Sequence, residues 1–138
     1  MSEPDFKGIE KVRVGKVGLL QTTINLDAHY FNPNHSKFRL KNASGDVWID
    51  SIFLGHFVVD TLTRIPANSD FRVPVKLAAD MPFFLKNDIK AMLNKDVWVK
   101  IEGRANVAKS LFSKHIDIHY EGKQNLGEFL KGMPVLKF

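Results

Sequence analysis

Cysteine is absent from this sequence of 138 residues, which excludes disulfides and thiol catalysis, so the fold must rest on packing alone. No apolar run approaches the roughly 20 residues that a membrane-spanning helix needs. The sequence also lacks a Gly-x-Ser-x-Gly nucleophile elbow, a Walker loop and a Gly-x-Gly-x-x-Gly fingerprint. Because no carboxylate pairs with a base at an interpretable spacing, we predict no catalytic residue, no cofactor and no enzyme activity.

Runs of adjacent basic residues are missing too, although the formal net charge is +5. Scattered lysines are typical of a solvated surface, and on edge strands they discourage edge-to-edge association. Binding to nucleic acid or to an anionic membrane would favour clustered basic residues and stacking aromatics, so it is the weaker alternative. We therefore expect no nucleic-acid partner, no integral membrane segment and a monomer.

The length suits one domain. We place a β-domain at residues 1–122 and an apolar tail at residues 123–138, where Gly127, Gly132 and Pro134 interrupt any regular element. A solvated tail is rarely so apolar, so we expect it to pack on the domain or, alternatively, to dock on a partner.

Apolar and polar residues alternate along most of the chain, as in β-strands with one buried face. The longest example places Ile24, Leu26, Ala28 and Tyr30 on one face. Strands are predicted at residues 8–17, 19–31, 46–54, 56–65, 70–78, 96–103 and 111–121. The spacing changes to a helical period over residues 81–94. Roughly seven strands with one helix favour a mainly β, antiparallel two-sheet sandwich.

The string His115-Ile116-Asp117-Ile118-His119 invites a metal-site interpretation. On a strand, however, the two histidines stand about 13 Å apart at about 3.3 Å per residue. They cannot share one ion, because zinc–nitrogen bonds are about 2.0–2.1 Å long. An exposed polar strand face is the favoured interpretation, and no metal is expected.

Four aromatic residues are candidates for contact with other proteins: Trp48, Trp98, Phe83 and Phe84. Strict alternation places both tryptophans on the outer face of their strands. Either the helix or a loop covers them, which suits the high average burial of tryptophan, or they form an exposed aromatic contact surface.

The most specific string is Asn32-Pro33-Asn34, directly after the long alternating strand. Proline forces the preceding residue into an extended conformation, and asparagine suits the turn that follows. Further along stand Asp46-Val47-Trp48-Ile49, Ile65-Pro66-Ala67-Asn68-Ser69 and Val73-Pro74-Val75. In this order the strings resemble the type-two late embryogenesis abundant family, also called the water stress and hypersensitive response (WHy) domain, from about Pro4 to Glu121.

The resemblance implies an immunoglobulin- or fibronectin-type-III-like sandwich with one helix. It also implies a folded, non-catalytic protein of desiccation or cold stress that shields client proteins from denaturation and aggregation through weak apolar contacts. Only Asn32, Pro33 and Asn34 transfer from the family, in a structural role. The alternative function is an envelope-associated adhesion or assembly module with one specific protein partner. The expected compartment is the cytoplasm as the sequence is written, or the periplasm or envelope if a lipoprotein signal was removed.

Overall fold

Eight β-strands, all paired antiparallel, make up the computed structural model, which describes residues 2–80, 95–125 and 127. Their bounds are β1 Asp5–Val17, β2 Gln21–Asn32, β3 Phe38–Ile49, β4 Ile52–Val59, β5 Thr63–Ile65, β6 Ser69–Asp80, β7 Asp96–Lys109 and β8 Phe112–Asn125. The prediction of a mainly antiparallel β-protein is confirmed.

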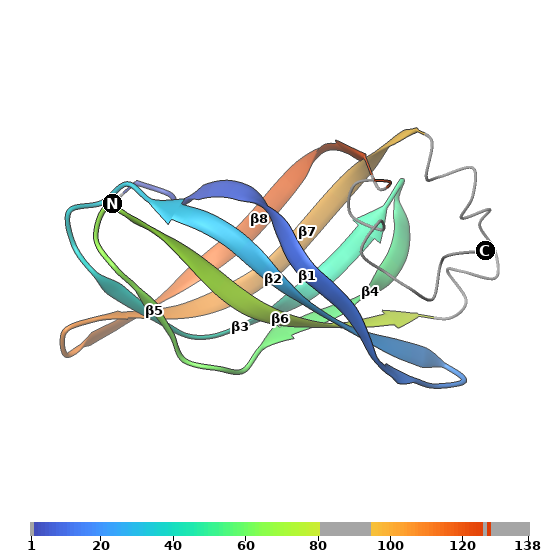
Figure 1. Cartoon of the computed structure of the whole chain (residues 1–138), viewed down its shortest axis with the longest axis horizontal. Helices are drawn as coiled ribbons and strands as arrows, with labels where there is room; N and C mark the ends of the chain where they lie inside the picture. The colour runs from blue at the N-terminus through green and yellow to red at the C-terminus, as the bar shows by residue number, and fades with distance from the viewer. Residues whose placement is uncertain (1, 81–94, 126, 128–138) are drawn as a thin grey trace.

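The strands form one hydrogen-bonded sheet in the order β1-β2-β6-β4-β3-β7-β8, with β5 paired to β3 beside this path. In Figure 1, β1, β2 and β6 cross over β3, β7 and β8, so the sheet doubles over on itself. The turning point is the short pairing of β4 with β6, from Gly55 opposite Ala79 to Val58 opposite Lys76. A sandwich of two separate sheets is not confirmed, because this pairing makes the hydrogen bonding continuous.

The helix predicted over residues 81–94 lies outside the described residues, as does all of the apolar tail beyond residue 127.

Two predicted strands were wrong in their bounds. Residues 56–65 hold the end of β4, a break at residues 60–62 and β5, and the first part of β3, residues 38–45, was not predicted as a strand. Residues 46–54 form the end of β3, a two-residue turn and the start of β4. Asp50 and Ser51 both have positive φ, at 49° and 68°, which is the geometry of a type I′ hairpin turn. That turn type favours Asn-Gly or Asp-Gly, so the Asp-Ser pair indicated a hairpin turn only weakly.

The core lies inside the folded sheet, and the alternation that predicted it is confirmed. Ile24, Leu26 and Ala28 of β2 are buried. So are Val97 and Val99 of β7. Residues from six strands, β2 to β7, join one cluster, against which Ile9 of β1 and Ile118 of β8 also pack. Both edge strands therefore help to close the same core.

Pro74 lies in β6, opposite Asp27 of β2. The pairing of β6 with β4 covers only Lys76 to Ala79, so Pro74 has a strand neighbour on one side alone. Since proline cannot donate a ladder hydrogen bond, this open stretch of β6 is the place where it fits.

Two glycines face each other inside the ladder that pairs β3 with β7. Gly45 is the register partner of Gly103. A Cβ on Gly103 would collide with the backbone of Ser44 and of Gly45, and one on Gly45 would also meet the ring of Phe57. The close approach of the two strands therefore depends on the absence of side chains at this pair.

We expect Gly103→Ala to lower the free energy of unfolding by about 1–3 kcal/mol, because the backbone that a methyl group would meet can move only by distorting the ladder. Gly122→Ala is the control, since its Cβ would meet the tip of the Tyr120 side chain, which can turn away. Urea denaturation measures both. If both variants lowered the free energy of unfolding by the same small amount, the close approach of β3 and β7 at Gly45 and Gly103 would be contradicted.

Candidate functional site

Asn32 ends β2 and is only 1% exposed, yet all four of its side-chain hydrogen-bonding positions are used. Its Nδ2 donates to the carbonyl oxygens of Ser36, at 3.2 Å, and of Pro66, at 2.9 Å. Its Oδ1 accepts from the backbone N–H of Asn34, at 3.0 Å, and from Asn34 Nδ2, at 2.9 Å. A buried amide with every partner supplied joins the β2–β3 loop firmly to the β5–β6 loop.

Asn34 extends this connection in two directions. Its carbonyl accepts the backbone N–H of Asn68, which has a φ of 48°, at 3.0 Å. Its side chain exchanges two hydrogen bonds with the backbone of Ser2, at 2.9 and 2.8 Å. The Asn32-Pro33-Asn34 string thus contacts the Pro66–Asn68 string, and both make structural contacts at one end of the sheet.

Asn32→Ala should lower the free energy of unfolding by about 2–4 kcal/mol, because it leaves buried carbonyls and an N–H without their partners. Asn34→Ala should cost less, since its side chain is only half-buried and water can replace it. Thermal or urea unfolding compares the two variants. A smaller loss for Asn32→Ala than for Asn34→Ala would contradict the buried role of Asn32.

At the opposite end of β3, Trp48 is half-buried on the outer face of the sheet. Its ring lies edge-on to Phe53 of β4, with the ring centroids 6.0 Å apart. The Nζ of Lys100, from β7, lies 5.2 Å from the centroid of the same ring. A cation at this distance is attracted by the face of the indole, so Trp48 has contacts on two sides.

Trp98 of β7 is 44% exposed. Its backbone is fixed by Asp50, in the turn after β3, whose N–H donates to the Trp98 carbonyl while its carboxylate accepts the Trp98 N–H, both at 2.8 Å. The Asp50 side chain thus continues the β3–β7 ladder past the end of the strand. This contact sets where the exposed tryptophan stands relative to Trp48.

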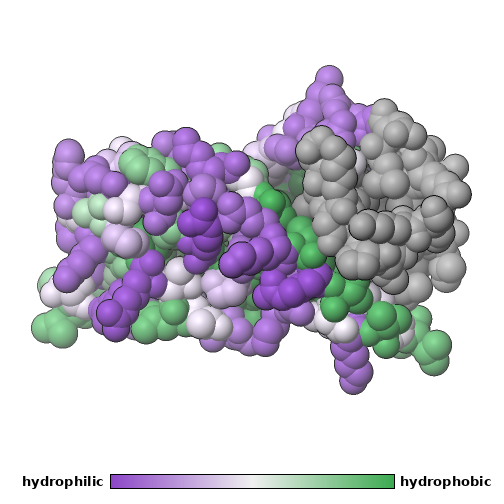
Figure 2. Space-filling model, in the orientation of Figure 1, coloured by the Kyte–Doolittle hydropathy of each residue, from purple (hydrophilic) through white to green (hydrophobic). Residues whose placement is uncertain are grey.

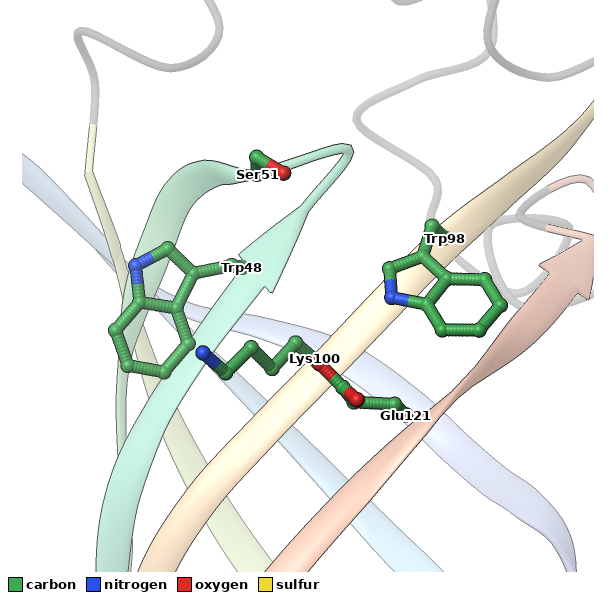
Figure 3. A pocket seen from close by; sticks show the side chains of 5 residues that line it. All are labelled: Trp48, Ser51, Trp98, Lys100 and Glu121. Atoms are coloured by element: carbon green, nitrogen blue, oxygen red, sulfur yellow. The ribbon is translucent and has the colours of Figure 1, made fainter.

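The two tryptophans line an open hollow of about 250 Å³, together with Ser51, Lys100 and Glu121. Figure 3 shows Lys100 reaching between the indoles toward Trp48, with Glu121 on the neighbouring strand. Lys100 and Glu121 are opposite each other in the β7–β8 register. An aromatic hollow with one cation and one carboxylate suits contact with a mixed apolar and polar surface.

Basic side chains on the same outer face stand next to carboxylates. Lys100 Nζ lies 3.5 Å from Glu102, and His119 Nδ1 lies 3.4 Å from the same carboxylate. On the other half of the sheet, Arg72 donates to Glu10 at 2.7 Å. This guanidinium holds the pKa of the Glu10 carboxyl below its ordinary value. Each of these basic side chains thus has a carboxylate within 3.5 Å.

Large exposed apolar side chains gather at the hairpin turns. The β1–β2 hairpin carries Val17, Leu19 and Leu20, and the β3–β4 hairpin carries Ile52 and Phe53 close in sequence to Trp48. The β7–β8 hairpin carries Leu111 and Phe112. Figure 2 shows the matching pattern, with hydrophilic residues over the body of the molecule and hydrophobic ones toward its ends.

Two of the five residues that line the hollow, Trp48 and Trp98, were predicted from the sequence as candidate contact residues. Their outward placement followed from strand alternation. Phe83 and Phe84 lie outside the described residues. Lys100 and Glu121 were missed because their pairing with Trp48 depends on the register of three strands, and Asp50 was missed because the turn was not recognised.

His115, Asp117 and His119 all lie on β8, as the sequence indicated, and are exposed. Within residues 2–80, 95–125 and 127, no group of three or more potential metal ligands occurs. Over the same part of the chain, no helix has the length and apolar character to cross a membrane.

No family model matches the sequence, and neither does any curated protein. Solved structures do match the fold. A crystal structure of a protein from Archaeoglobus fulgidus superposes with a TM-score of 0.54 at 11% identity, covering 88% of this chain and 97% of that one. The solution structure of AT1g01470 from Arabidopsis thaliana superposes with a TM-score of 0.54 at 9% identity, covering 89% and 80%. At these identities the similarity is one of fold alone.

Acrylamide quenching should separate the two tryptophans. Trp48→Phe leaves only Trp98, whose fluorescence should be quenched more efficiently because nearly half of the side chain meets solvent. Trp98→Phe leaves Trp48, which Phe53 and Lys100 partly shield. Equal quenching of the two single-tryptophan variants, or weak quenching of both, would contradict an exposed Trp98.

Proposed function

We propose that this chain is a type-two late embryogenesis abundant, or WHy-like, protein. It acts without catalysis and shields client proteins from denaturation and aggregation during desiccation or cold. Under this proposal, the doubled sheet is a variant of the immunoglobulin- or fibronectin-type-III-like sandwich that the resemblance implies. The observation that carries the proposal is the hollow between Trp48 and Trp98, an aromatic surface within a face of paired charges.

The family resemblance gains support from contacts that the sequence order alone could not provide. Asn32 and Pro66 belong to separate strings of the motif, 34 residues apart, and a hydrogen bond of 2.9 Å joins them. Asn34 and Asn68 are joined in the same way. Strings that serve one structural connection are expected to occur together in a family, since changing one member leaves the other without its partner.

The mechanism is weak and reversible binding to apolar surface that a client exposes when it begins to unfold. Trp98 supplies a large, rigid aromatic contact, which is the residue type that dominates protein interfaces. Lys100 and Glu121 flank it and keep the hollow hydrated when no client is bound. The neighbouring ion pairs hold the free protein apart from its copies and keep a complex dispersed.

Protection of a labile enzyme against heat- and freeze-induced aggregation tests the proposal. The intact chain should protect better than albumin does, with little dependence on salt, because the contact is apolar. Trp98→Ala should lose most of this protection. Phe112→Ala is the matched control, since it removes an aromatic that is 79% exposed at the β7–β8 turn.

Three results would contradict the proposal in different ways. No protection by the intact chain would remove the shielding function and favour an assembly module, for which a single partner should be sought by pull-down. An equal loss of protection in Trp98→Ala and Phe112→Ala would show that any exposed aromatic residue can contact the client and that the hollow is not special. Protection that disappears steeply with salt would point to charge rather than to the tryptophan surface.

A further inference from the structure

The two edges of the sheet differ in a way that bears on association. β1 is irregular, with three register shifts against β2 and with positive φ at Gly8 and Lys11. Such bulges twist an edge away from a possible partner strand. β8 pairs with β7 over 14 residues without a single shift. Its outer edge is long, regular and free of proline, which is the kind of edge that can accept another strand.

Side chains on β8 alternate between two kinds. Ile116, Ile118 and Tyr120 are half-buried on the inner side. The outer side carries His115, Asp117, His119 and Glu121, all exposed, and the side chain of Asp117 is 88% exposed. A strand that paired with this edge would therefore meet an apolar row on one face and an alternating row of imidazoles and carboxylates on the other.

The charged row is complementary to itself. When a second β8 lies antiparallel to the first with Ile118 opposite Ile118, Asp117 faces His119 of the second copy and His115 faces Glu121. On the inner face, Ile116 then faces Tyr120. Between residues 115 and 121, every facing pair is either apolar with apolar or a carboxylate with an imidazole, and two-fold symmetry provides each mixed pair twice.

Other registers lose this match. With the axis at Asp117, that carboxylate faces its own copy and His115 faces His119. With the axis at His119, Asp117 faces Glu121. An axis at Tyr120 keeps opposite charges together but places Ile118 against Gly122, so the apolar row is broken.

From this asymmetry and self-complementarity we infer that the chain forms a two-fold dimer by pairing β8 with β8 of a second copy, centred on Ile118. In the free chain Asp117 lies 3.6 Å from Arg104 and His119 lies 3.4 Å from Glu102, both of β7, so each side chain has a partner of its own chain before a second copy binds. The surface shares Glu121 with the hollow at Trp48 and Trp98, and it fits a copy of this chain rather than a client. Under this inference, the monomer expected from the sequence is the state that predominates at low protein concentration, in equilibrium with the dimer.

The absence of cysteine makes the register directly testable. In Ile118→Cys the two thiols meet at the axis, where the Cα atoms of facing residues are about 4.5–5.5 Å apart, and mild oxidation should link the dimer. Ile116→Cys is the matched control: it is half-buried on the same face, but its two copies would lie about 13 Å apart. Cross-linking at residue 116 or at Tyr120→Cys in preference to residue 118 would overturn the assignment.

Charge reversal gives a second test that leaves the core untouched. Analytical ultracentrifugation from about 10 µM to about 1 mM should show reversible dimerisation. Asp117→Lys should weaken it by roughly tenfold or more, and Asp117→Lys with His119→Asp should restore it. Asp5→Lys, the same reversal on the opposite edge, should change nothing. A chain that is monomeric throughout this range, or a dimer that ignores Asp117→Lys, would overturn the proposal.

Discussion

The short pairing of β4 with β6 is the constraint on which the rest of the molecule depends. Four residues of each strand, Gly55–Val58 and Lys76–Ala79, join one half of the sheet to the other. Without that pairing, β1, β2 and β6 would form a separate three-stranded sheet, held to the other strands by side-chain packing and the connecting loops alone. Gly55 makes the junction possible, because a Cβ there would collide with the backbone of Ala78. The doubled sheet then encloses three neighbouring clusters of buried apolar residues, and among the described residues the buried polar ones are Asn32 and Thr63.

The two ends of this sheet are used differently. At one end, buried amide hydrogen bonds from Asn32 join two loops and leave no polar position of that side chain unused. At the other end, the carboxylate of Asp50 in the β3–β4 turn accepts a hydrogen bond from the backbone of β7. Trp98 is exposed there and Trp48 is half-buried. A rigid end opposite an exposed aromatic end agrees with a domain whose contacts are made on one side.

Local periodicity predicted most of the strands and the buried face of β2, because a side chain in a strand meets the core or the solvent according to its position alone. Trp98 was placed outward on the same argument. The β3–β4 turn was not predicted, since Asp50 and Ser51 adopt positive φ without the glycine that normally marks such turns. The doubling of the sheet was also missed, because the β4–β6 junction is set by close backbone approach and not by any pattern of apolar residues. Asn32 was recognised as structural, but its partners Ser36 and Pro66 are known only once the loops are in place.

The irregularity of β1 decides how far any edge-to-edge association could extend. If both edges were straight, β8 of one copy could pair with β1 of the next, and each addition would expose a new β1 to continue the row. Such head-to-tail addition produces fibres unless the rotation between copies closes it into a ring. The bulges at Gly8 and Lys11 remove the second acceptor, so pairing through β8 uses up the one regular strand of the two that end the strand order. Association limited in this way stops at two copies, and the positive φ values in β1 are the structural origin of that limit.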